Sequence, residues 1–295
     1  MNAPEQGFLL LTSSLGDPMR KPLTVAQFRT LSQRVKQTDP PSVQREMTEA
    51  DFISLGYDHV MAQRILTLLS QKDQLYWYLA KGRQANSFPI SRISANYPAI
   101  LRKRLGLDAP GCLWAKGDLT LLETKAIALV GSRELQHENL IFAREAGKQA
   151  ALQGFTLVSG NARGADREAQ NACLEAGGSV ISVIADRLEK CPVQKNVLFL
   201  SEDGFNLEFT TQRALSRNRI IHCLGLLTFV AQCSLQKGGT WDGTVQNLRK
   251  QWGTVCCYQD GTPAMRELEQ KGATPITIKQ LADIPALQYT DPKFF

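Results

Sequence analysis

The sequence predicts an α/β protein with a mostly parallel β-sheet and a small helical domain at its amino terminus. Apolar runs of strand length, rich in Val, Ile and Leu, recur between residues 126 and 258, and segments of helix length separate them. Residues 1–85 carry helix-like segments instead. Strands that alternate with helices are typical of a parallel sheet covered by helices on both faces.

Residues 1–85 are predicted to form a separate helical module. Thr24 is a suitable N-cap for a first helix, and Thr48 precedes a second helical unit. Gly56 and Tyr57 divide this second unit into two short helices. Two helices around a glycine turn can form a helix-hairpin-helix, which contacts the DNA backbone, or a simple αα-hairpin, and the sequence leaves both open.

Residues 86–125 are predicted to form a connector of short strands and turns that leads into the sheet. Tyr97-Pro98 favours an extended conformation, and a short helix that begins at Ile100 carries three consecutive basic residues at 102–104. Such a run is usually a solvated face, but it can also extend a basic surface.

Residues 126–295 are predicted to form one Rossmann-like domain. Its apolar runs predict parallel strands at residues 126–130, 155–159, 179–184, 226–230 and 254–258. The remaining pattern predicts helices at residues 192–204, 213–223, 243–251 and 263–271, a brief strand at 206–209 and a last strand at 274–278.

Two glycine-bearing loops follow the first two predicted strands, Gly131-Ser132-Arg133 and residues 159–166. Ligands of open α/β sheets bind beyond the carboxyl ends of the strands. Glycine permits close backbone approach, and the start of the following helix favours an anion. Arg133, Arg163 and Arg167 add forked donors that suit phosphate oxygens. The loops therefore predict a phosphate site, with tight turns and solvated arginines as the alternative.

The composition is that of a folded protein. Hydrophobic residues make up 43% and charged residues 21% of the chain, and the net charge of +6 can favour a polyanion. Since no run approaches the roughly 18 apolar residues of a membrane helix and no signal peptide is evident, a cytoplasmic protein with no membrane partner is predicted. Seven cysteines without paired spacing predict reduced, mostly structural thiols.

Three motifs occur in a fixed order: Val130-Gly131-Ser132-Arg133, the SG-x-ARG-x-D pattern at residues 159–166, and Arg217-Asn218-Arg219-Ile220-Ile221. In order and spacing they resemble the DNA-processing protein A family, also called DprA or Smf, over about residues 96–261. The resemblance implies an extended Rossmann-like sheet, a sterile-alpha-motif-like amino-terminal module and a homodimer. It also implies binding of single-stranded DNA and loading of a RecA-type recombinase during uptake of foreign DNA.

The matching positions carry a set of nucleic-acid-binding roles onto this sequence. For Arg217 and Arg219, contact with DNA and a structural role at the sheet edge both remain open. Gln170 stands where the family usually has histidine, so the chain resembles a divergent member. The residues implied to bind nucleic acid are Arg133, Ser159, Gly160, Asn161, Arg163, Gly164, Arg167, Lys195, Asn196, Arg217 and Arg219.

A small-nucleotide site is the alternative function. Lys237, Gly238, Gly239, Thr240, Gly243 and Thr244 form a possible phosphate loop that resembles the signature of the LOG-type phosphoribohydrolases. Asn247 stands where that signature needs a glutamate, and an amide cannot serve as a general base. The sequence also contains no dinucleotide or P-loop motif and no metal-ligand spacing, so no cofactor, metal or catalytic residue is predicted.

Overall fold

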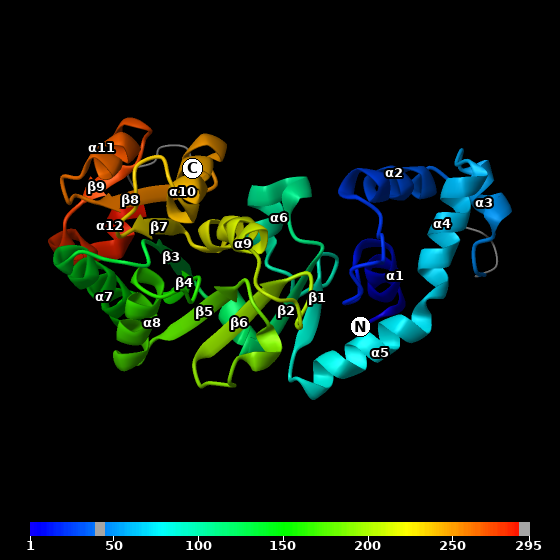
Figure 1. The fold of residues 1–295 in the computed structure, drawn as a ribbon, viewed down its shortest axis with the longest axis horizontal. Coiled ribbons are helices and arrows are strands. Elements are labelled where there is room, and N and C mark those ends of the chain that lie inside the picture. The colour runs from blue at the N-terminus through cyan, green and yellow to red at the C-terminus, as the bar shows by residue number, and fades with distance from the viewer. Residues whose placement is uncertain (39–44, 289–295) are drawn as a thin grey trace.

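The computed structural model describes residues 1–38 and 45–288, which form a sheet with helices on both faces and a group of helices beyond one edge (Figure 1). The strand order is β1-β2-β6-β5-β4-β3-β7-β8-β9. β2 runs antiparallel to both of its neighbours, and the strands from β6 to β9 are parallel to one another. The strands are β1 (Phe88–Ser91), β2 (Cys112–Gly117), β3 (Ala126–Val130), β4 (Thr156–Ser159), β5 (Ser179–Ile184), β6 (Val197–Glu202), β7 (Leu227–Val230), β8 (Thr254–Tyr258) and β9 (Thr274–Ile276).

The predicted fold class is confirmed, because all five predicted parallel strands lie in this one sheet. Both faces of the sheet are covered, which is why the strands are continuous apolar runs. Neighbouring residues of one strand therefore belong to different cores. Cys256 packs in the core on one face and Cys257 in the core on the other.

Residues 192–204 were predicted as a helix, and this prediction is wrong, because they contain strand β6. β6 lies between β2 and β5 and pairs with both, and its first five residues are buried. A short apolar run fits a buried strand and a helix equally well, so periodicity alone does not separate them. Residues 206–209 are likewise not a strand; they lead to Thr210, which caps helix α9 (Thr211–Leu224).

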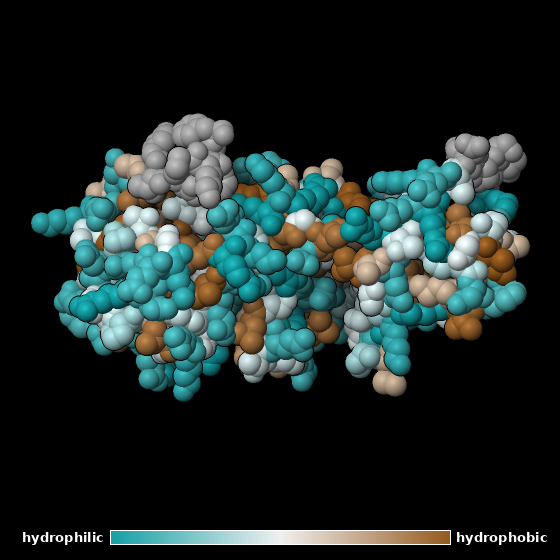
Figure 2. Space-filling model, turned by 90° about the horizontal axis from the view of Figure 1, so that it is seen from above, coloured by the Kyte–Doolittle hydropathy of each residue, from teal (hydrophilic) through white to brown (hydrophobic). Residues whose placement is uncertain are grey.

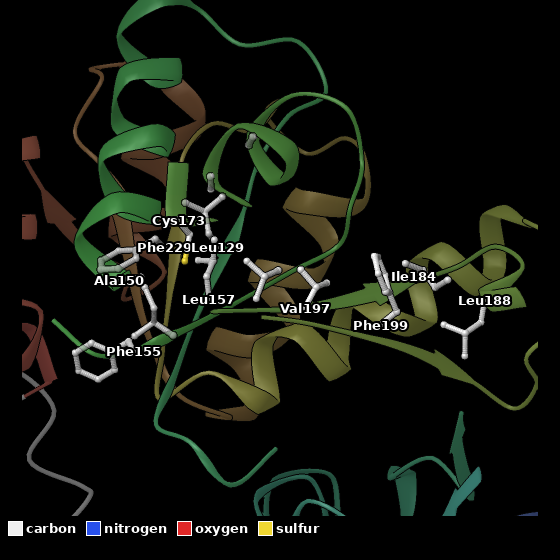
Figure 3. Close-up of a cluster of buried hydrophobic side chains, with 14 of the residues drawn as sticks. Leu129, Ala150, Phe155, Leu157, Cys173, Ile184, Leu188, Val197, Phe199 and Phe229 are labelled. Atoms are coloured by element: carbon white, nitrogen blue, oxygen red, sulfur yellow. The ribbon is translucent and has the colours of Figure 1, made fainter. Parts of the chain in front are cut away.

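Helices cover the sheet in two layers. On one face lie α7 (His137–Leu152), α8 (Ala165–Glu175) and α12 (Ile284–Gln288). On the other lie α6 (Ala99–Leu105), α9, α10 (Gly239–Lys250) and α11 (Pro263–Gln270). Figure 3 shows part of the first core, where Leu129, Leu157 and Val197 project from β3, β4 and β6. A fully buried leucine of this kind stabilises the fold by about 1.5–3 kcal/mol.

The amino-terminal helices are α1 (Ala3–Thr12), α2 (Val25–Lys36), α3 (Glu49–Ser54), α4 (His59–Ser70) and α5 (Lys72–Gln84). They share a small core that includes Leu31, Phe52 and Ile65. Thr24 caps α2 as predicted, since its side chain accepts a hydrogen bond from the backbone N–H of Gln27. Sequence reasoning missed α1, which packs with its buried leucines between this core and the sheet.

An aromatic cluster joins these helices to the sheet. Tyr78 of α5 contacts Trp114 of β2 edge to face at 5.1 Å between ring centroids, and both rings contact Phe205. The hydroxyl of Tyr78 lies 2.9 Å from Oδ1 of Asn206. The cluster fixes α5 against the antiparallel edge of the sheet. Within the described residues, no helix is both long enough and apolar enough to cross a membrane.

Candidate functional site

A crevice opens where the strand order of the sheet reverses. From β3 the chain proceeds through β4, β5 and β6 on one side, and from β7 it proceeds through β8 and β9 on the other. The loops after β3 and β7 therefore diverge, and such a switch point is the usual ligand site of an open α/β sheet. A cavity of about 470 Å³ lies there. Its lining includes Gly131, Ser132, Arg133, Ala162, Asp166, Phe209, Thr211, Leu215, Arg217, Asn218, Lys237, Gly238, Gly239 and Thr240.

The loop after β3 is held tightly while its arginine stays free. A Cβ on Gly131 would lie 2.4 Å from Cβ of Ala165, so only glycine fits. The backbone N–H of Ser132 donates to the carbonyl oxygen of Gln232 at 2.9 Å. Arg133 is exposed, and its guanidinium has no hydrogen bond or ion pair with any residue in the described part of the chain. The loop thus presents to the cavity a cation that no carboxylate among the described residues pairs with directly.

The loop after β4 lies against the first loop, as the sequence predicted. Gly164 has φ of +86°, and a Cβ there would lie 2.4 Å from the carbonyl oxygen of Ser132. Asn161 also has a left-handed conformation, with φ of +60°, which asparagine tolerates better than most residues. Asp166 at the start of α8 accepts a hydrogen bond from the backbone N–H of Ala162 at 3.2 Å, which fixes the loop.

The arginines of this second loop do not join Arg133 in the cavity. Arg163 pairs with Glu134 at 3.0 Å, and the two side chains are 74% and 88% exposed. An ion pair with such exposure is weak. Arg167 is exposed on α8 and does not line the cavity. The predicted convergence of Arg133 and Arg163 on one pocket is therefore not found.

Ser159 and Gly160 shape the crevice from below. Ser159 is fully buried, and its hydroxyl accepts a hydrogen bond from Nε2 of Gln170 at 2.6 Å. A Cβ on Gly160 would lie 1.6 Å from Nη1 of Arg217, so this glycine makes room for the guanidinium. The predicted nucleic-acid contact of the Ser159 side chain is not supported by this arrangement, because the buried hydroxyl is bound to Gln170 and does not line the cavity.

Arg217 lies at the floor of the crevice with only 9% of its surface exposed. Its Nη1 donates to the carbonyl oxygen of Val183 at 2.7 Å, and its buried Nε has no partner among the described residues. Burial lowers the pKa of Arg217, and the nearby Asp166 opposes this. Burial also raises the pKa of Asp166, against the effect of Arg217. Because an arginine stays protonated in proteins, the floor keeps a positive charge that is only partly compensated.

Arg219, Lys195 and Asn196 lie away from the crevice. Arg219 forms an ion pair with Glu202, and its Nε donates to the carbonyl oxygen of Asp108 at 3.2 Å, so its role in the structure is to brace α9. Lys195 and Asn196 precede β6, in a turn rather than at the predicted helix start. β6 is parallel to β3 and β4. Lys195 and Asn196 therefore lie at the amino-terminal ends of the strands, whereas the two loops lie at the carboxyl ends.

Four of the six residues predicted as a small-nucleotide loop line the same crevice: Lys237, Gly238, Gly239 and Thr240. Lys237 is exposed and lines it, and Gly238 has φ of +89° where α10 begins. The hydroxyl of Thr240 donates to the carbonyl oxygen of Gly131 at 3.0 Å, which ties this loop to the loop after β3. The amino terminus of the 12-residue helix α10 therefore opens toward Arg133, and helix amino termini attract anions.

Gly243 and Thr244, predicted as part of this loop, lie inside α10 and are buried. A Cβ on Gly243 would lie 3.1 Å from Nε2 of His222, so the glycine lets α10 and α9 approach each other. Asn247 is also buried, where its Nδ2 lies 3.2 Å from Nδ1 of His222 and its Oδ1 accepts from the backbone N–H of Gly253. These residues pack two helices and do not face the crevice.

Sequence reasoning missed the wall that α9 supplies. Thr211 and Leu215 line the crevice, and Phe209 does so just before the helix, with half of its surface exposed. Asn218 lines it too and donates to the carbonyl oxygen of Gly239 at 2.9 Å. Only Asn218 had a signal in the sequence, since it lies inside the motif at residues 217–221.

Comparisons with known proteins match most of this architecture. The family model of DNA recombination-mediator protein A matches residues 89–284. Protein Smf of Escherichia coli is 29% identical over 190 residues, which cover 60% of this chain and 49% of that protein. DNA processing protein DprA of Streptococcus pneumoniae is 30% identical over 188 residues, covering 59% of this chain and 66% of that one. The chain thus spans about half to two thirds of the length of these relatives.

Two solved structures have the same fold. The X-ray structure of DprA from Streptococcus pneumoniae has a TM-score of 0.71 at 24% identity, and the match covers 95% of this chain and 97% of that one. DNA processing protein A from Helicobacter pylori has a TM-score of 0.57 at 21% identity, covering 68% of this chain and 95% of that one. Because the family model matches about two thirds of the sequence, including every strand that surrounds the crevice, the chain belongs to the DNA recombination-mediator protein A family.

Proposed function

We propose that this protein binds single-stranded DNA through its phosphates at the crevice and acts as a recombination mediator in the uptake and processing of DNA. One observation carries the proposal: cations occupy both walls and the floor of a single cavity. Arg133 and Lys237 stand on the two loops of the switch point, and Arg217 lies beneath them. The amino terminus of α10 adds partial positive charge between the walls.

Related proteins support this proposal. DNA processing protein A from Helicobacter pylori, whose fold this chain shares, has a single-stranded DNA binding mode that is described as unique. By the same relationship we propose a RecA-type recombinase as partner, a homodimer as the assembly and the cytoplasm as the location. We retain the division into a sterile-alpha-motif-like module at 1–85, a connector at 86–125 and a DNA-binding domain at 126–295 as part of the proposal.

We propose binding without turnover. Among the described residues that line the crevice, Asp166 is the carboxylate, and it is buried and occupied in holding the loop at Ala162. General acid–base chemistry on a sugar needs a carboxylate that can reach the ligand, usually with a second one opposite. Asn247, at the position of the LOG-type glutamate, packs inside α10 with its amide engaged.

A mononucleotide remains a second candidate ligand, because a cavity of about 470 Å³ is large enough for one. Salt dependence separates the two ligands. An oligodeoxythymidylate of about 20 nucleotides should lose affinity linearly on a log–log plot of affinity against salt, with a slope of about 0.7 for each phosphate contacted. If the affinity depends only weakly on salt concentration and micromolar thymidine monophosphate displaces the oligonucleotide completely, the mononucleotide is the better assignment.

A further inference from the structure

A second cavity, of about 770 Å³, separates the amino-terminal helices from the sheet. One wall is helix α2, and the other is formed by the segment after β1 and the short turn of 3₁₀-helix at Gly106–Asp108. Figure 2 shows hydrophobic side chains gathered between the surfaces of α6 and α2. We name this cavity the inter-module groove. It shares no lining residue with the crevice.

Exposed apolar side chains from three separate segments meet in the inter-module groove. Val25 of α2 is 52% exposed, Ile93 is 46% exposed and Leu107 is 44% exposed. Beneath them, the largely buried rings of Phe28 and Trp252 contribute to the lining. Single exposed apolar residues are ordinary on a protein surface, but their convergence on one hollow is typical of an interaction site.

Helix α2 lines the groove along its whole length. Val25, Arg29, Gln33 and Lys36 follow one another at helical spacing and face the groove, while Leu31 packs into the core of the amino-terminal helices. From residue 25 to residue 36 the helix rises by about 16 Å, or three turns. The groove is therefore as long as a partner helix of about three turns.

The α2 wall of the groove carries positive charge that no ion pair within the described residues compensates. Arg29 and Lys36 have no ion pair with any described residue, and the side chain of Arg92 on the opposite wall donates to the carbonyl oxygen of Leu107. The lining also contains three acidic residues: exposed Asp108 lies on the wall opposite α2, and Glu202 is paired with Arg219. Burial raises the pKa of Asp203 to about 7, and the nearby Glu202 adds to the rise, so this carboxyl is only partly charged at neutral pH.

We propose that the inter-module groove docks an amphipathic helix of a partner protein, apolar on one face and acidic along its flanks. A strand is disfavoured, because the backbone N–H of Arg92 already donates to the carbonyl oxygen of Gly111, so this wall offers no open edge there. Nucleic acid is disfavoured too, because the exposed apolar residues of the lining are aliphatic and the rings of Phe28 and Trp252 are largely buried, which leaves little aromatic surface on which bases can stack.

A labelled peptide tests the proposal on the full chain. The probe is a helical peptide of about 14 residues with leucines on one face and glutamates on the flanks, and its affinity is measured by fluorescence anisotropy. We expect saturable, salt-sensitive binding that Ile93→Asp and Leu107→Asp each weaken by about tenfold or more. Val60→Asp is the matched control, because Val60 is 80% exposed on α4 and lies outside the groove.

The charges are tested separately. The double variant Arg29→Glu, Lys36→Glu should bind the glutamate-flanked peptide more weakly. It should bind a lysine-flanked peptide with the same apolar face more tightly. Because all these positions are exposed, the variants should keep the melting temperature of the parent. Equal binding of both peptides, equal binding by all variants, or displacement of the peptide by oligodeoxythymidylate would each overturn the proposal. So would dissociation of a self-associated form by Leu107→Asp, which would assign the groove to a second copy of the chain.

Discussion

Gly160 and Arg217 occupy complementary space beneath the crevice, with no room for a methyl group between them. A Cβ on Gly160 would lie 1.6 Å from Nη1 of Arg217. The guanidinium is held there by the carbonyl oxygen of Val183 and by the charge of Asp166. Gly160 is thus required by a buried arginine from α9, whereas Gly164 of the same loop has a positive φ.

The first prediction follows from this pair. Gly160→Ala should displace Arg217 and lower the stability by about 1–3 kcal/mol, the usual cost of overpacking, while oligonucleotide affinity also falls. Thermal unfolding and anisotropy measure the two effects. Gly154→Ala is not a suitable control, because Gly154 has a positive φ, whereas Gly7 has open space around its Cβ position and a negative φ. Gly7→Ala, inside helix α1, should raise the stability by about 0.5–1 kcal/mol and leave oligonucleotide affinity unchanged, and a Gly160→Ala variant that is not destabilised would contradict the described packing.

The second prediction separates the arginines of the two loops. Arg133→Ala should weaken binding of single-stranded DNA by about 1–3 kcal/mol, the range of a charged hydrogen bond, and reduce the salt slope by about 0.7. Arg163→Ala should have a much smaller effect, because Arg163 is paired with exposed Glu134 outside the crevice. Arg249→Ala, at the far end of α10 from the crevice, controls for net charge. A larger loss from Arg163→Ala than from Arg133→Ala would place the DNA outside the crevice.

The sequence allowed the sheet and its two glycine loops to be predicted because these features are local. Apolar runs mark the strands, and Gly131 and Gly164 mark the points where two loops touch. Whether a polar side chain faces the crevice or is buried depends on packing between segments that are distant in the sequence. The sequence implies a ligand contact for Ser159, but Gln170 covers its hydroxyl, and the position of Arg217 at the floor of the crevice depends on the space that Gly160 leaves.

The boundaries of α10 show a related limit. The glycines and threonines of residues 238–244 predict a loop, but the helix begins at Gly239. Within the helix, Gly243 provides close packing against α9, because a Cβ there would lie only 3.1 Å from Nε2 of His222. The helix predicted at residues 192–204 is wrong for a different reason. A short apolar run fits a helix or a strand, and here it forms a strand because it pairs with β2 and β5.

The third prediction concerns the attachment of the amino-terminal helices. Tyr78→Phe removes the hydrogen bond to Asn206 but keeps the ring between Trp114 and Phe205. It should cost about 1 kcal/mol in the free energy of unfolding, because the partly buried side chain of Asn206 loses its bond. Tyr76→Phe is the matched control, since Tyr76 lies on the same helix with 48% of its surface exposed. Chemical denaturation measures both, and equal effects would show that the Asn206 bond is not important for stability.

The fourth prediction is a pH dependence of stability that comes from His222. This side chain is fully buried between α9 and α10, and burial lowers its pKa to about 4 from an ordinary value near 6.5. Between these two pH values the unfolded chain binds a proton that the folded chain does not, so stability falls as the pH is lowered through this window. The contribution is about 3 kcal/mol, fully present above pH 6.5 or so and lost by about pH 4.

In His222→Gln the amide can still face Asn247 but does not titrate, so the unfolding free energy should vary less with pH from 6.5 to 4 than in the parent. His137→Gln serves as control, because His137 is exposed at the start of α7. A parent protein whose stability is flat across this window, or a His222→Gln variant with an unchanged slope, would show that His222 accepts a proton without unfolding.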